Sequence, residues 1–336
     1  MTNTYILLAP ILVSFLVSLF FLPSWINRAK KAGLVGKDMH KPRKSLVAEG
    51  GGITIIAGFI LGTLLYIALK TFYFKTTTNI IESFALITVV LIISLIGLID
   101  DLFGWKLGLR KRYRILLVFL AAIPLMVINA GESVVTLPLI GRINLGLIYP
   151  LLVIPIGVLG ASTTFNFLAG FNGLEARQGI LMLGALAIAT WLTGNSWLAV
   201  INLIMIASLI AFLFYNLNPA KVFPGNVMTY AVGALIASTA ILGNLERFAV
   251  FIFIPNIIEV FLKLRGKLKV ESFGKVKRDG SLDIQQDKIC GLTHLSIKLI
   301  KKIKGKVYEN DVVLAINIFQ ILIIILGFIV FKGGIF

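Results

Sequence analysis

Two adjacent aspartates, Asp100 and Asp101, directly follow an apolar run over residues 80–99. A carboxylate pair at the edge of an apolar slab is unfavourable unless a cation offsets its charge. Mg²⁺ could supply that charge, and so could the basic segment at residues 106–114. At the C-terminal end of a helix, the pair would also face the negative end of the helix dipole. The pattern alone leaves a second interpretation open, a helix that stops at two solvated acids.

A second polar cluster has the sequence NFLAGFNGLE and occupies residues 166–175. It places Asn166, Gly170, Asn172 and Glu175 within ten residues. Glycines let backbone N–H groups approach a ligand closely, and asparagine amides both donate and accept hydrogen bonds. These groups suit recognition of a nucleobase or a sugar. The alternative is an ordinary Asn-Gly turn.

Two further segments combine glycines with charged or amide side chains. Residues 33–52 include Lys37, Asp38 and Glu49 and end in three glycines, and Asn226 directly follows a Pro-Gly pair. The alternatives here are glycines that pack helices together and a simple helix start. Walker A, GxSxG and zinc-type Cys/His patterns do not occur in the sequence.

The elements that must position these residues are long apolar segments. The 336 residues are 58% hydrophobic and only 14% charged, with a mean hydropathy of +0.97. A water-soluble fold of this length could not bury so much apolar surface, and a disordered chain would not contain it. A single cysteine also excludes an intrachain disulfide scaffold. The composition indicates an integral membrane protein.

Apolar runs of roughly 17–25 residues predict about ten membrane-spanning helices. They cover residues 5–24, 50–69, 80–99, 115–130, 147–166, 179–194, 196–215, 226–243, 247–262 and 312–331. Pro255 and Glu259 predict a kink or break in the ninth span. We expect one all-α polytopic membrane domain over residues 1–336, with a short hairpin at 131–146 on the external side.

The basic residues divide unequally between the two sets of connecting loops. One set carries 27 of the 32 Lys and Arg residues: 27–49, 100–114, 167–178, 216–224 and 263–311. This excess predicts that these loops are cytoplasmic and that both termini lie on the opposite side. The net charge of +17 then reflects membrane topology and anionic lipids or substrates, not nucleic acid. The loop 263–311 is too short for a second domain.

Together these features resemble the polyprenyl-phosphate N-acetylhexosamine-1-phosphate transferase family. The Asp pair and the stretch NFLAGFNGLEA at 166–176 are most similar to its archaeal and eukaryotic UDP-GlcNAc–dolichyl-phosphate GlcNAc-phosphotransferase branch. The resemblance implies transfer of GlcNAc-1-phosphate from UDP-GlcNAc to a dolichyl or polyprenyl phosphate, with release of UMP, as the first lipid-linked step of N-glycosylation. It implies Mg²⁺, with Mn²⁺ as an alternative, cytoplasmic catalytic loops, and a homodimer as one arrangement.

The resemblance also assigns roles to residues. It implies catalytic roles for Asp100, Asp101 and Arg114, and metal ligation by Asp101, Asn166 and Asn226. The substrate-binding positions would be Lys37, Asp38, Glu49, Asn166, Gly170, Asn172, Glu175, Lys269 and Lys275. The last two are assigned only by their location in the loop 263–311, where the family's His- or Arg-rich motif is not recognisable.

Other departures from the family pattern occur at Asn226, where an aspartate is usual, and at Gly104, where an asparagine is common. An amide oxygen can bind Mg²⁺ but brings no negative charge. Alternative functions are the same reaction with another UDP-sugar or lipid, and a non-catalytic membrane protein that binds or transports a UDP-sugar. A transporter would carry its polar residues near the bilayer midplane, whereas here they cluster at one face.

Overall fold

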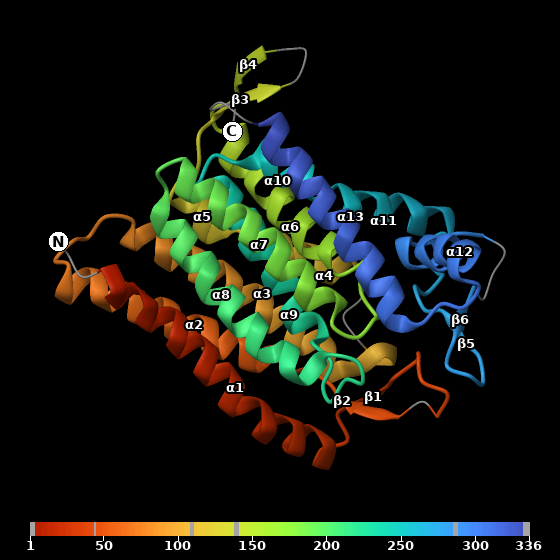
Figure 1. Ribbon diagram of the computed structural model, residues 1–336. Helices are drawn as coiled ribbons and strands as arrows, with labels where there is room; N and C mark the ends of the chain where they lie inside the picture. The colour runs from red at the N-terminus through yellow and green to blue at the C-terminus, as the bar shows by residue number, and fades with distance from the viewer. Residues whose placement is uncertain (1–3, 44, 108–110, 138–140, 285–287, 332–336) are drawn as a thin grey trace.

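The computed structural model describes residues 4–43, 45–107, 111–137, 141–284 and 288–331, and these are predominantly helical (Figure 1). The α-helices are α1 (Leu8–Lys31), α2 (Gly52–Ala68), α3 (Ile80–Leu107), α4 (Lys111–Leu120), α5 (Ile123–Val127), α6 (Ile154–Phe165), α7 (Leu174–Leu192), α8 (Ser196–Asn216), α9 (Gly225–Leu242), α10 (Glu246–Ile252), α11 (Ile254–Arg265), α12 (Leu292–Lys304) and α13 (Glu309–Val330). A 3₁₀ turn precedes α1, and single π-helical turns follow α2 and precede α6.

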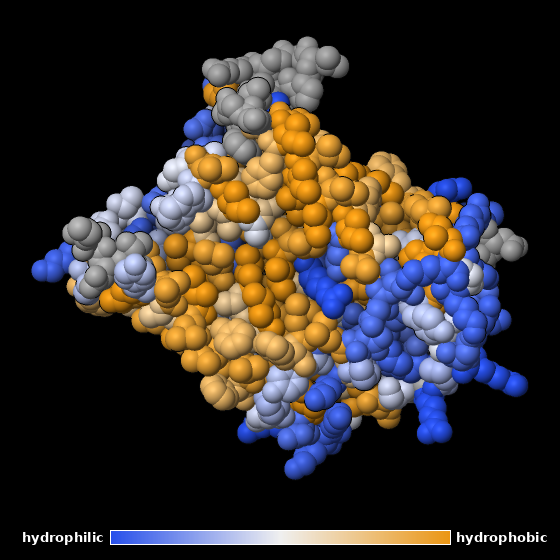
Figure 2. Space-filling model, viewed as in Figure 1, coloured by the Kyte–Doolittle hydropathy of each residue, from blue (hydrophilic) through white to orange (hydrophobic). Residues whose placement is uncertain are grey.

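Within the described residues, six helical segments are long and apolar enough to cross a membrane. They are Tyr5–Lys31, Gly52–Tyr73, Ile80–Phe103, Ser196–Asn216, Gly225–Leu242 and Glu309–Val330. Figure 2 shows a broad apolar surface over the helices, with hydrophilic residues gathered at the ends of the molecule. The chain is therefore an all-α membrane protein in its main architecture, and ten spans remain a prediction.

Helix α9 forms the centre of the bundle and packs against α2, α3, α6 and α7, while α7 packs on α8 and α1 on α2. In its most apolar 18-residue window, 83% of α9 is buried, against 22% for α1. One face of α9 contributes to an apolar core shared with α2, α7 and α8, and another face contributes to a second core shared with α3 and α6. These cores fix the position of α9, at whose start Asn226 lies.

Two predicted spans are interrupted. The prediction of one helix over 115–130 is wrong, because α4 ends at Leu120 and α5 begins at Ile123. Pro124 has no N–H, so the hydrogen bond to the Leu120 carbonyl that would continue α4 into α5 cannot form, which favours a break at this point. The predicted break in 247–262 is confirmed at Phe253, just before Pro255, where α10 gives way to α11.

Three short antiparallel hairpins lie at the ends of the bundle: β1 (Val35–Lys37) with β2 (Leu46–Ala48), β3 (Val134–Leu137) with β4 (Gly141–Asn144), and β5 (Lys275–Val276) with β6 (Leu282–Asp283). The hairpin predicted within 131–146 is confirmed, and the segment 263–311 holds both a hairpin and α12. In Figure 1, β1–β2 and β5–β6 lie at one end of the molecule and β3–β4 at the other.

Backbone hydrogen bonds fasten the first of these loops to the segment that precedes α9. The Phe223 N–H donates to the Ala48 carbonyl at 2.7 Å, and the Gly51 N–H donates to the Phe223 carbonyl at 2.9 Å. Helix α3 reaches the same place because Gly97 has no side chain. A Cβ there would lie 2.7 Å from the Asn226 carbonyl carbon and oxygen. Three segments distant in sequence therefore meet at the start of α9.

Candidate active site

A cavity of about 650 Å³ lies where these segments meet. Eleven of the thirteen site residues predicted from the sequence line it: Lys37, Asp38, Glu49, Asp100, Asp101, Arg114, Asn166, Gly170, Asn172, Glu175 and Asn226. They come from three of the five loops predicted to be cytoplasmic, from the end of α6 and from the start of α9. Their individual roles remain predictions, but the structure places them around a single space.

The environment of the Asp pair differs from the sequence-based expectation. Helix α3 continues to Leu107, so the pair lies within the helix and not at its C-terminal end. The Asp101 carboxylate accepts hydrogen bonds from the backbone N–H groups of Asn226, at 2.9 Å, and Val227, at 3.1 Å. Both donors belong to the first turn of α9, whose positive dipole end stabilises an anion. The interpretation as a solvated helix stop is therefore wrong.

Two side chains donate hydrogen bonds to Asp100. The Arg114 guanidinium donates to Asp100 Oδ2 at 3.0 Å, and the Asn226 amide nitrogen donates to the same oxygen at 3.0 Å. Asp100 is buried, whereas Asp101 is partly exposed. Arg114 thus pairs with one of the two carboxylates, so the basic segment supplies part of the positive charge that the pair requires.

The glycine before Asn226 has a specific geometric reason. Gly225 has a φ of +72°, a backbone conformation that side chains disfavour. A Cβ at this position would also lie 2.3 Å from Asp101 Oδ2. The Pro-Gly-Asn segment therefore brings the start of α9 close to the Asp pair, which a plain helix start would not require.

The 166–175 segment forms a turn held by side chains. Asn166 Oδ1 accepts a hydrogen bond from the Thr229 hydroxyl at 2.8 Å, and Gly173 N–H donates to Asn216 Oδ1 at 3.0 Å. The Glu175 carboxylate accepts from Gly170 N–H at 2.8 Å and so closes the turn. Glu175 lies outside the predicted span 179–194. Burial raises the pKa of its carboxyl group to about 7.

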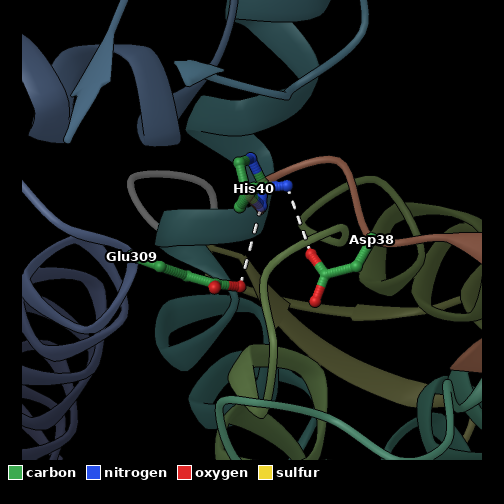
Figure 3. Close-up of side chains that lie close together, drawn as sticks. All are labelled: Asp38, His40 and Glu309. Carbon is green, nitrogen blue, oxygen red and sulfur yellow. Dashed lines mark hydrogen bonds and ion pairs between the residues drawn. The ribbon is translucent and has the colours of Figure 1, made fainter. Parts of the chain in front are cut away.

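Behind this turn lies a buried polar network that the sequence did not reveal (Figure 3). Asp38, His40 and Glu309 are each less than 5% exposed, and Glu309 is the first residue of α13. Glu309 Oε1 accepts from the Asn172 N–H at 2.8 Å, and Asp38 Oδ2 accepts from the Asn172 amide nitrogen at 2.9 Å. The Lys41 ammonium donates to Glu309 Oε2 at 2.5 Å.

Two groups of side chains carry donor atoms that suit a metal. Asp38, His40 and Glu309 lie within metal-binding distance of one another, but the Lys41 ammonium and the Asn172 N–H groups already engage their carboxylate oxygens. The Asp pair, by contrast, lines the cavity together with the amides of Asn166 and Asn226. Carboxylate and amide oxygens are the ligands that Mg²⁺ prefers.

Two predicted residues lie elsewhere. Lys269 and Lys275 are exposed and do not belong to the described lining of the cavity. Lys275 instead lines a second hollow of about 330 Å³ beside Lys277 and Arg278. From the same loop, the aromatic side chain of Phe273 lines the main cavity, although only basic residues were predicted to do so.

Several other lining residues were not predicted from the sequence, among them Met39, Phe171, Asn216 and Thr229. Thr229 had a usable signal, because it lies three residues after Asn226 and shares its face of α9. Phe171 stacks against His40 with ring centroids 4.0 Å apart. No sequence signal connects His40 to Phe171, since the two belong to different loops.

Residues 83–244, which include the Asp pair and the 166–175 turn, match the family model described as glycosyl transferase family 4. A protein from Saccharolobus solfataricus is 39% identical over 326 residues, which cover 95% of this chain and 96% of that protein. The chain belongs to glycosyl transferase family 4. The family resemblance inferred from the sequence is thereby confirmed.

The names of these relatives describe transferases. The Saccharolobus protein is named "Putative UDP-N-acetylglucosamine--dolichyl-phosphate N-acetylglucosaminephosphotransferase". A Dictyostelium discoideum protein with the same name, without the first word, is 27% identical over 70% of this chain and 66% of its own length. A Geobacillus phospho-N-acetylmuramoyl-pentapeptide-transferase is 28% identical over 80% of this chain and 85% of its own.

Proposed function

We propose that this protein transfers GlcNAc-1-phosphate from UDP-GlcNAc to a dolichyl or polyprenyl phosphate and releases UMP, as the first lipid-linked step of N-glycosylation. The observation that carries the proposal is the single cavity that joins the Asp pair and Arg114 to the 166–175 turn. The names of the related proteins support the choice of sugar and lipid.

The reaction explains the charged residues at the cavity. An oxygen of the lipid phosphate forms a bond to the β-phosphorus of UDP-GlcNAc, and the bond from this phosphorus to the bridging oxygen breaks as UMP leaves. Two anions must approach each other, so positive charge has to screen their repulsion. Arg114 and Lys37 line the cavity and can supply part of it, while Asp100 or Asp101 can accept a proton from the lipid phosphate.

The charge of the cavity supports a requirement for Mg²⁺, with Mn²⁺ as an alternative. Among the described residues that line it, five carry a carboxylate and only two carry a positive side chain. Such a surface would repel two phosphorylated substrates. The residues that would hold the ion are Asp101, Asn166 and Asn226. When bound, the ion would offset much of this excess and stabilise negative charge on the transferred phosphate.

We also propose that the cavity faces the cytoplasm. It lies at the end of the bundle that carries β1–β2 and β5–β6, where the loops with 27 of the 32 basic residues lie (Figure 1). Helix α1 ends and helix α13 begins at this end, so both chain termini would lie on the other side. The excess of basic residues on one set of loops supports this orientation.

The direct test is UMP release by the purified protein supplied with UDP-GlcNAc, Mg²⁺ and a short polyprenyl phosphate, with the Asn226→Asp variant assayed in parallel. Release by the native chain is the expected result and would show that an amide suffices at position 226. Release by the variant alone would identify a member disabled at one metal ligand. Absence of release from both, with UDP-GlcNAc and with other UDP-sugars, would contradict the proposal.

A further inference from the structure

Glu309 connects three parts of the chain behind the cavity. It is 4% exposed, and Asn172, His40 and Lys41 all approach its carboxylate. Oε1 accepts from the Asn172 backbone N–H at 2.8 Å and lies 3.6 Å from His40 Nδ1, while Oε2 accepts from the Lys41 ammonium at 2.5 Å. Neither Glu309 nor His40 belongs to the described lining of the cavity, so both act from behind it.

The network also fixes which way the Asn172 amide points. Its Nδ2 lies 2.9 Å from Asp38 Oδ2 and 3.5 Å from Glu309 Oε2. Ionised carboxylates only accept hydrogen bonds, so the amide nitrogen must face them. The amide oxygen, Oδ1, is then the atom of this side chain that is left to accept a hydrogen bond from a ligand in the cavity.

The contacts of Lys41 distinguish a metal site from a cluster that holds side chains in place. Its ammonium lies 3.8 Å from Asp38 Oδ2 and 2.5 Å from Glu309 Oε2, so it neutralises part of the charge of two buried acids. A metal ion would have to displace Lys41 and the Asn172 donors from the same oxygens. The cluster is therefore arranged to hold side chains in place and not to bind a cation.

We infer that Glu309 is a positioning residue that sets the affinity for the UDP-sugar through Asn172. The inference rests on the proposed function, because it takes the cavity as the UDP-sugar site. Glu309 holds both the backbone and, with Asp38, the side-chain amide of Asn172, so that Oδ1 faces the ligand. Loss of this support lets the amide rotate and present either a donor or an acceptor.

The test is calorimetric binding of UDP-GlcNAc, without the lipid acceptor, to the full chain and its Glu309→Gln variant. The change is nearly isosteric, but the new amide nitrogen cannot accept a hydrogen bond, so one of the contacts from Asn172 or Lys41 is lost. We expect the Kd to rise about tenfold. In turnover, the KM for UDP-GlcNAc should rise while kcat and the KM for the lipid phosphate change by less than about twofold.

A double-mutant cycle separates positioning from a merely structural role. Asn172→Ala should itself weaken UDP-GlcNAc binding about tenfold, and Glu309→Gln in that background should add less than about twofold. The matched control is Asp311→Asn, two residues further along α13, where the carboxylate accepts the Tyr308 N–H and lies outside the described lining. It keeps an acceptor for this N–H but removes the ion pair with Lys304 at the same end of α13, and should leave the Kd unchanged.

The inference is overturned if Glu309→Gln binds UDP-GlcNAc as the native chain does, or if its effect adds in full to that of Asn172→Ala. An equal loss of affinity in Asp311→Asn would also overturn it, since any damage to the start of α13 would then suffice. Binding without UMP release in the native chain would contradict the proposed reaction alone. Absence of UDP-GlcNAc binding by the native chain would overturn both.

Discussion

Two pairs of carboxylates flank the cavity, and each is accompanied by one cation. Asp100 and Asp101 are neighbours on α3 and are accompanied by Arg114, whereas Asp38 and Glu309 lie 271 positions apart and are accompanied by Lys41. Both members of the first pair line the cavity, and Asp101 is partly exposed. In the second pair both acids are buried, and only Asp38 belongs to the lining.

The difference lies in what the carboxylate oxygens contact. In the second pair all four carboxylate oxygens accept hydrogen bonds from loop residues or from Lys41, so the groups that stabilise its negative charge belong to the protein itself. In the first pair, Asp101 accepts hydrogen bonds from backbone N–H groups of α9, and these do not neutralise its charge. Similar residue types thus serve two purposes. The first pair can act on a ligand, and the second holds the loops around it.

The largest expected effect is on turnover, at the first pair. Asp101→Asn should lower the rate of UMP release by about a thousandfold or more, because it removes a charge that lines the cavity. The amide nitrogen of the variant would also face a backbone N–H donor of α9, so one hydrogen bond would be lost. Asp283→Asn is the control, since this carboxylate pairs with Lys277 and Lys301 away from the cavity. Turnover within about tenfold of the native rate would remove Asp101 from the mechanism.

The second effect compares stability with turnover. Loss of the cation should mainly lower stability at the second pair and mainly lower UMP release at the first. Lys41→Met leaves Asp38 and Glu309 buried without their cation, and should lower the free energy of unfolding by about 2 kcal/mol, since Lys41 is partly exposed. Arg114→Met should lower Tm less and UMP release more. Thermal unfolding in detergent and the UMP assay, both on the two variants, measure this reversal. If both variants lose the same property, the two pairs do not differ in purpose.

A smaller effect is expected at Asn226. Asn226→Asp replaces a donor to Asp100 with a third carboxylate, so like charges repel when no metal is bound. The variant should therefore melt below the native chain in EDTA, and Mg²⁺ should raise its Tm by several degrees more than it raises the native Tm. An equal response to Mg²⁺ in both proteins would separate Asn226 from the metal site.

The smallest effect is on the pH dependence of stability, at Glu175. Burial raises its pKa from 4.5 to about 7, so the folded state binds this proton more tightly than the unfolded chain does. The stability gained from the proton is complete below about pH 4.5 and is lost as the pH rises through about 7. Glu175→Gln keeps an acceptor for Gly170 N–H but does not titrate. The Tm of the native chain should therefore fall relative to the variant between about pH 5 and pH 8, and parallel curves would contradict this.

Much of the candidate site could be predicted because its residues lie in short contiguous patterns. Asp100-Asp101, residues 166–175 and Asn226 each stand out locally against an apolar background. The network behind the site left no such signal, because Glu309 and His40 become neighbours only after the last helix packs beside the first loop. Lys269 and Lys275 were chosen by location alone, and the fold directs Phe273 from that loop into the cavity instead.

The sequence by itself determined that this protein is embedded in lipid and that its polar groups lie between the apolar segments. Apolar runs must be buried in lipid or in the bundle, and polar residues are then confined to the ends. The tertiary structure decided which of these groups meet and which charges are satisfied. The start of α9 offers its N–H groups to Asp101, and Lys41 lies between two buried acids. Such contacts depend on distances and directions across helices, which no local pattern encodes.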